Sequence, residues 1–166
     1  MRCSDCGQEH ELLDPSFSRP DVIFAMSADE KKGRVLENDD ICALRGDGGA
    51  ADRFFVRCTM PVRLLDGPGS SRWGLWAEVA SEDSVTIWNA WDDPNQAQVR
   101  PMQARLANRV PGYPDTIGLP ASLQLTGPTT RPELSLAPES THPFVRECRA
   151  GVGIHRVKEW LEAIAG

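Results

Sequence analysis

The sequence predicts an α+β fold in which an antiparallel sheet of about five strands is flanked by helices. Residues 53–64 and 72–80 alternate apolar and polar side chains, which is the period of a half-buried strand. Two segments near the end, which begin at Pro143 and Ile154, instead repeat their apolar residues at helical spacing. A chain of 166 residues, 40% of them hydrophobic, is also long enough to bury a core of its own.

We expect a single domain over residues 1–166. A Cys-x-x-Cys knuckle and a lead-in segment occupy residues 1–33, and the sheet and helices occupy residues 34–166. In the lead-in segment Ser27 is suited to cap a short helix, because acidic residues follow it in the first turn and Gly33 follows at the end. This segment has little apolar content from which to build a core.

The longest predicted strand, 53–64, contains Pro61, which lacks a backbone donor and indicates an edge position or a bulge. In the strand at 72–80, Trp73 is expected in the core, whereas Trp76 faces the other side of the sheet beside a glycine. The other strands are expected at 41–44, 102–110, 121–126 and 133–136. Helices are expected at 82–92, from Pro143 to Gly151 and from Ile154 to Ile164.

The N-terminus carries the pattern Cys-x-x-Cys-Gly-x-x-His, whose possible metal ligands are Cys3, Cys6 and His10. Two thiols at this spacing can hold one ion from a tight turn, and zinc prefers thiolate and imidazole ligands in a tetrahedron. A structural zinc ion would also stabilise a loose terminus. The fourth ligand must come from the folded body, where Cys42 and His142 are the candidates, while His155 is expected to be exposed. The alternative is a turn without metal that carries reduced thiols.

The formal net charge is −6, and the first third of the chain holds all of it. Residues 1–52 contain twelve acidic and six basic residues, whereas residues 53–166 contain twelve of each. Nucleic acid is not an expected partner, because phosphate binding needs clustered lysine and arginine. The acidic third could face a basic protein, or it could be a solvated surface. With no apolar run near the roughly 18 residues of a membrane helix and no signal peptide, we expect a cytoplasmic protein without membrane contact.

The sequence contains no nucleophile elbow, phosphate loop or dinucleotide fingerprint, so we assign no catalytic residue and do not expect an enzyme. The leading hypothesis is a non-enzymatic binding protein, for example an inhibitor or immunity protein for a basic partner. The alternative is a small enzyme or ligand-binding protein with a pocket formed by Tyr113, Asp115, Arg131 and His142, lined by Trp76. The competing interpretation is that the loop around Tyr113 is an ordered crossover and that Trp76 packs in the core. The sequence does not give the oligomeric state.

Several short motifs occur in a fixed order along the chain. They are Cys-x-x-Cys-Gly-x-x-His, Asp40-x-Cys42, Trp73-Gly74-x-Trp76, Pro111-Gly112-Tyr113-Pro114-Asp115-Thr116-x-Gly118-Leu119, Arg131-Pro132, His142-Pro143 and Gly151. With them the chain resembles a bacterial family of uncharacterised proteins, domain of unknown function 2199. The resemblance implies an architecture and no activity. One departure is Phe55-Val56-Arg57-Cys58, where the family has glycine in place of Cys58, a thiol expected in the core.

Overall fold

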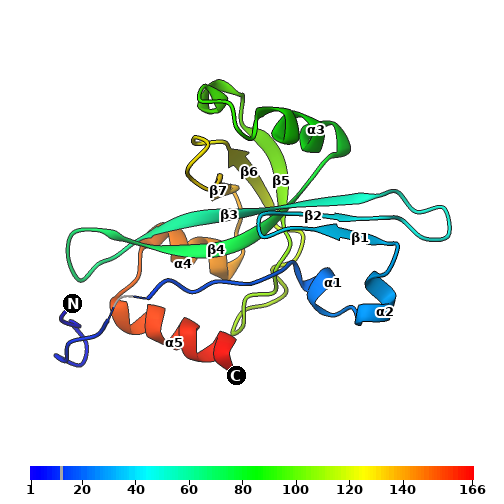
Figure 1. Ribbon diagram of the computed structural model, residues 1–166. Helices are drawn as coiled ribbons and strands as arrows, with labels where there is room; N and C mark the ends of the chain where they lie inside the picture. The colour runs from blue at the N-terminus through cyan, green and yellow to red at the C-terminus, as the bar shows by residue number, and fades with distance from the viewer. Residues whose placement is uncertain (12) are drawn as a thin grey trace.

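The computed structural model describes residues 1–11 and 13–166, and in this part of the chain seven strands form one sheet (Figure 1). Each strand pairs antiparallel with the next, in the order of the sequence. The strands are β1 (Val35–Glu37), β2 (Ile41–Leu44), β3 (Arg53–Arg63), β4 (Ser70–Val79), β5 (Met102–Leu106), β6 (Pro120–Gln124) and β7 (Glu133–Leu136).

The sheet closes on itself. The last strand, β7, returns to β3 in a parallel contact between Glu133 and Thr59, where the Thr59 N–H donates to the Pro132 carbonyl at 2.9 Å. Strands β3 to β7 therefore form a small barrel, and β1 and β2 extend it beyond the barrel wall. The long strand β3 makes this closure possible because the same edge of the strand pairs with β2 at residues 53–56 and with β7 at Thr59.

The predicted α+β class is confirmed, but the expected antiparallel sheet of about five strands flanked by helices differs in detail, because β3 to β7 close into a barrel and β1 and β2 are additional strands. Alternation along a strand shows which face is buried and does not show whether the first and last strands meet. The strand expected at 102–110 also ends at Leu106. The chain turns away at Asn108, whose carbonyl accepts a hydrogen bond from the Thr116 hydroxyl at 2.7 Å.

The helices are α1 (Asp21–Phe24), α2 (Ala28–Lys31), α3 (Ser81–Ala90), α4 (Pro143–Ala150) and α5 (Ile154–Ala165), with a short 3₁₀ turn at Gln96–Gln98. The expected cap at Ser27 is confirmed, since its hydroxyl accepts the Glu30 N–H at 3.2 Å while the Glu30 carboxylate accepts the Ser27 N–H at 2.6 Å. None of the helices in the described residues is long and apolar enough to cross a membrane.

Two cores lie on opposite sides of the sheet. The main core joins the inward side chains of the barrel strands, among them Trp73, to α4 and α5. The second core lies between β2, β3, β4 and α1, and it contains Phe55, Trp76 and Ile23. The two tryptophans thus face opposite sides, as the alternation predicts, but the face of Trp76 is covered by the lead-in segment and α1.

The lead-in segment is held against β4 at Gly74. The Gly74 N–H donates to the Pro15 carbonyl at 2.8 Å, and the Gly74 carbonyl accepts the Phe17 N–H at 2.9 Å. A Cβ at Gly74 would lie 2.6 Å from the Cβ of Ser16, so only glycine allows this close approach. The contact directs the first residues of the chain toward the start of α5 (Figure 1).

Candidate metal centre

The first ten residues fold into a small loop that brings the two knuckle thiols together. Its ends pair where the His10 N–H donates to the Met1 carbonyl at 2.9 Å, and the Cys3 N–H donates to the Gln8 carbonyl at 2.8 Å. Gly7 has a φ of 70°, in the left-handed region that favours glycine, and its N–H donates to the Cys3 carbonyl at 2.9 Å. The glycine of the motif therefore closes the turn.

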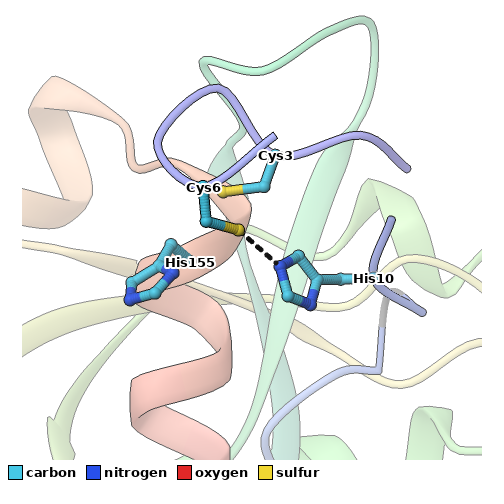
Figure 2. A group of neighbouring side chains, drawn as sticks. All are labelled: Cys3, Cys6, His10 and His155. Atoms are coloured by element: carbon cyan, nitrogen blue, oxygen red, sulfur yellow. Dashed lines mark hydrogen bonds between the residues drawn. The ribbon is translucent and has the colours of Figure 1, made fainter. Parts of the chain in front are cut away.

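Four potential metal ligands meet where this loop contacts α5 (Figure 2). Cys3, Cys6, His10 and His155 each offer one ligand atom, and these atoms all lie within 4.8 Å of one another. The Cys6 Sγ lies 3.1 Å from the His10 Nε2. Two thiolates and two imidazoles are a ligand set of tetrahedral zinc, in which ligand atoms are roughly 3.3–3.8 Å apart. The residues present therefore fit a zinc ion after a contraction of about 1 Å.

A carboxylate lies near His155, one turn further along α5. Its Nε2 lies 3.8 Å from the Glu159 carboxylate, whereas its Nδ1 is buried and has no hydrogen-bond partner in the described part of the chain. Histidines that bind metals usually give their second ring N–H to a carboxylate or a carbonyl. A metal ion at Nδ1 would satisfy the buried nitrogen, so the surroundings of His155 suit a ligand.

Asp66, in the loop between β3 and β4, connects the two parts of the ligand group. One of its carboxylate oxygens accepts hydrogen bonds from the Ser4 hydroxyl and from the Ser4 N–H at 3.1 Å, and the other accepts the N–H of Ile154 at the start of α5. These donors, the Ser4 hydroxyl foremost, lower the pKa of Asp66. The carboxylate thus holds the knuckle beside the helix that carries His155.

The thiols of the chain differ in their surroundings. The backbone N–H of Cys6, supported by that of Asp5, lowers the pKa of the Cys3 thiol against the effect of burial, which favours the thiolate that a metal binds. Burial dominates elsewhere: it raises the pKa of Cys42 and Cys148 to about 12 and also raises the pKa of Cys58. The expectation that Cys58 is a core thiol is confirmed.

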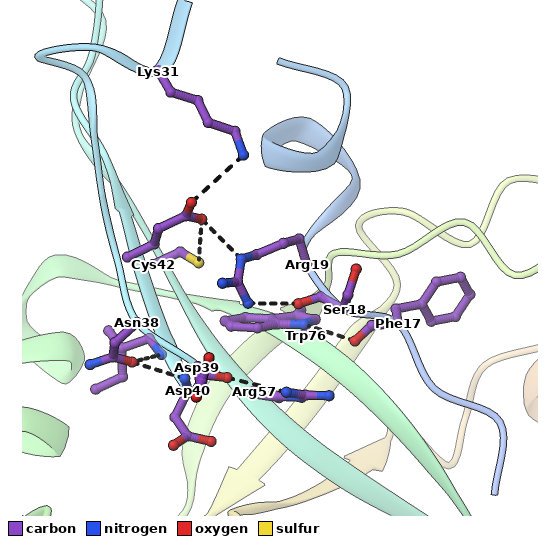
Figure 3. A network of polar contacts seen from close by, with 12 residues as sticks. Phe17, Ser18, Arg19, Lys31, Asn38, Asp39, Asp40, Cys42, Arg57 and Trp76 are labelled. Atoms are coloured by element: carbon purple, nitrogen blue, oxygen red, sulfur yellow. Dashed lines mark hydrogen bonds and ion pairs between the residues drawn. The ribbon is translucent and has the colours of Figure 1, made fainter. Parts of the chain in front are cut away.

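The fourth member of the ligand group is His155, and neither Cys42 nor His142, the candidates expected from the sequence, belongs to this group. Cys42 is buried in the second core, with its Sγ 3.9 Å from the Glu37 carboxylate (Figure 3). His142 caps α4, where its Nδ1 accepts the Phe144 N–H at 3.2 Å and its Nε2 lies 3.1 Å from the Pro114 carbonyl. No local motif identifies His155 as a ligand, because it approaches the knuckle only when α5 packs beside the N-terminal loop.

Trp76 does not line a ligand groove. Its side chain is fully buried, and its Nε1 donates to the Phe17 carbonyl at 3.2 Å. Its backbone N–H donates to the Asn108 side chain at 2.7 Å. The Arg19 guanidinium lies over the ring, 5.9 Å from its centroid, and closes this side of the second core (Figure 3). Core packing is therefore the role of Trp76.

Tyr113 packs against α4 and α5. Its hydroxyl donates to the Glu147 carboxylate and accepts hydrogen bonds from the Arg156 guanidinium at 3.0 Å and the Trp160 indole at 2.9 Å. Burial raises the pKa of Tyr113 to about 12, and the hydrogen bond to Glu147 acts in the same direction. These three partners satisfy the hydrogen-bonding groups of the Tyr113 hydroxyl, so its position is explained without a ligand.

The other proposed pocket residues lie on separate parts of the surface. Asp115 is exposed and lies 3.5 Å from Arg109, and it accepts the N–H of Ile117 within its own loop. Arg131, in the loop between β6 and β7, lies 3.2 Å from the Asp40 carboxylate, whereas Asp115 lies in the loop at the opposite end of β6. The five residues Trp76, Tyr113, Asp115, Arg131 and His142 do not converge, and the loop around Tyr113 is an ordered crossover.

No curated protein and no solved structure matches the chain. One family model matches residues 2–152, which include the knuckle, the barrel strands and the loop around Tyr113. His155 lies just beyond the matched residues. The match spans most of the chain, and the protein therefore belongs to the family described as "Uncharacterized protein conserved in bacteria (DUF2199)".

Proposed function

We propose that this protein binds one zinc ion through Cys3, Cys6, His10 and His155, and that the ion has a structural role. The observation that carries the proposal is the convergence of the four ligand atoms within 4.8 Å. Thiolate and imidazole ligands in a tetrahedral arrangement select zinc over magnesium or calcium, which prefer oxygen. Four protein ligands leave no open position for a water molecule, which is the property that separates structural zinc sites from catalytic ones.

The segment that the ion would fasten has few other means of attachment. Among the described residues before Pro15, only Cys3 is buried. Apolar burial therefore contributes little to holding this segment, and a bound ion would supply the missing free energy. A zinc ion here joins the beginning of the chain to its last helix.

A non-enzymatic binding protein is the activity class that accords with this site. The closed ligand set offers no catalytic water, and the residues considered for a catalytic pocket are dispersed. An inhibitory role toward a basic partner, as an immunity protein has, is a proposal supported only by the acidic charge of residues 1–52.

Elemental analysis of protein purified without chelators tests the metal proposal. We expect one zinc ion per chain in the native protein, and tetrahedral thiolate bands in the visible spectrum after replacement by cobalt. The variants Cys6→Ser and His155→Ala should lose most of the zinc, whereas His142→Ala should retain it. A native protein free of zinc, or a His155→Ala variant with unchanged zinc affinity, would contradict the proposal.

A further inference from the structure

An apolar groove lies beside β1 and β2, the two strands that extend the sheet beyond the barrel, on the face that α1 does not cover. It runs between β1, β2 and β3 on one side and α3 on the other, with a volume of about 440 Å³. Its apolar lining includes Leu36, Ile41, Ala43, Phe54, Val85 and Trp88. In Figure 1 the extension lies between α3 above and α1 and α2 below, so the groove and the second core occupy opposite faces.

Large apolar side chains stand exposed along both walls of this groove. Leu36 is 80% exposed on β1, while Val85 and Trp88 are 57% and 67% exposed on α3. Leu36, Ala43 and Phe54 are direct cross-strand neighbours on β1, β2 and β3, so their side chains form one continuous apolar surface on the strand side of the groove. A contiguous apolar surface of this kind is typical of a contact site, because its exposure to water is unfavourable.

The edge of the sheet borders the same groove. In the described residues β1 pairs only with β2, so its outer backbone groups have no strand beside them. An extended polypeptide could add to such an edge, with alternate side chains directed into the groove. This feature suits a protein segment better than a small ligand.

The α3 side of the groove carries acidic residues and no base, since residues 81–99 contain no lysine or arginine. Asp39 follows the lining residue Asn38, and Asp92 lies four residues after the lining residue Trp88, just beyond the end of α3. Both are exposed and make no ion pair in the described part of the chain. Arg53, next to the lining residue Phe54, is held by the Glu78 carboxylate through two contacts of 2.7 Å. The acidic excess therefore lies on the α3 side of the rim, while on the strand side the Arg57 guanidinium donates to the Asp39 carbonyl at 3.3 Å.

We infer that this groove binds a cationic amphipathic segment of another protein, with apolar side chains seated between Leu36 and Trp88 and lysine or arginine residues at the rim. The apolar surface supplies affinity, and the acidic rim selects the charge of the partner. The inference is independent of the zinc site, which lies at the start of α5.

Two peptides of leucine and lysine test the inference, one with alternating and one with helical spacing, each compared with its leucine and glutamate counterpart. We expect at least one lysine peptide to bind saturably, and to protect Trp88 from acrylamide quenching. Trp88 is suited to this measurement because Trp73, Trp76 and Trp160 are buried and Trp91 is partly buried, and a Trp91→Phe background removes the contribution of Trp91. Absence of saturable binding by both lysine peptides, or equal binding by the glutamate peptides, overturns the inference.

Matched variants locate the contact. Leu36→Asp should weaken binding at least about tenfold. Phe24→Asp, at a residue 74% exposed on α1, should leave binding unchanged. The double variant Asp39→Asn with Asp92→Asn should weaken binding and reduce its salt dependence. Its control is Glu82→Gln with Asp83→Asn, which alters acids that line a separate hollow on α3. Circular dichroism confirms that each variant is folded, and equal loss in a variant and its control overturns the inference.

Two other occupants would also overturn it. A second copy of the chain would give a dimer in sedimentation analysis that Leu36→Asp dissociates. A membrane would give binding to phosphatidylglycerol vesicles that Leu36→Asp abolishes.

Discussion

Tyr113 is the single tyrosine of the chain, and its hydroxyl joins the central loop to the last two helices. The Arg156 guanidinium donates to this hydroxyl and also to the Glu147 carboxylate, at 2.7 Å. The hydroxyl therefore has one acceptor and two donors around it. Such a network positions the loop, and it stabilises the neutral form of the phenol because an anion would face the Glu147 carboxylate in partly buried surroundings.

Titration of the tyrosine absorbance should give a pKa of about 12 in place of the ordinary 10. Because the folded pKa is higher than the unfolded one, this interaction stabilises the protein fully below pH 10, and its contribution is lost as the pH rises toward 12. Glu147→Gln should move the transition toward pH 10, whereas Glu139→Gln, at an exposed residue, should not. A native transition near pH 10, with circular dichroism unchanged, would contradict this account.

Secondary structure was largely predictable because it depends on local pattern. The strand β7 lies at the expected residues, β3 differs from its prediction by one residue, and α4 begins at Pro143 and stops before Gly151 as expected. Barrel closure was not predictable, because it depends on the pairing of β3 with β7 at Thr59 and Glu133, two residues far apart in the sequence. The ligand group divides in the same way, since Cys3, Cys6 and His10 share a local motif whereas His155 joins them only through helix docking.

The contact between β4 and the lead-in segment depends on one position without a side chain. Gly74→Ala would place a Cβ 2.6 Å from the Ser16 Cβ, so the two segments must separate. We expect a local loss of about 1–3 kcal/mol, seen as faster hydrogen exchange at the Phe17 amide with the barrel amides unchanged. Ser16→Gly combined with Gly74→Ala removes the opposing Cβ and should restore protection. Exchange at Phe17 that matches the wild type in Gly74→Ala would refute this explanation.

The whole molecule combines a self-sufficient body with a terminus that depends on a few polar contacts. Neither core includes a residue of the knuckle. The knuckle reaches the body through Asp66, through Gly74 by way of the lead-in segment, and through the ligand group at His155. Loss of the proposed zinc ion should therefore release the terminus without unfolding the barrel.

Removal of the proposed zinc ion with a strong chelator should make residues 1–11 sensitive to protease while the barrel and helices stay resistant. The melting temperature should fall, yet the circular dichroism at room temperature should change little, because the two cores stay buried without the ion. Restoring zinc should reverse both effects. The variant His155→Ala serves as the control, since it should be sensitive at the terminus from the start and show no response to the chelator. Complete unfolding on chelation would show instead that the ion supports the barrel itself.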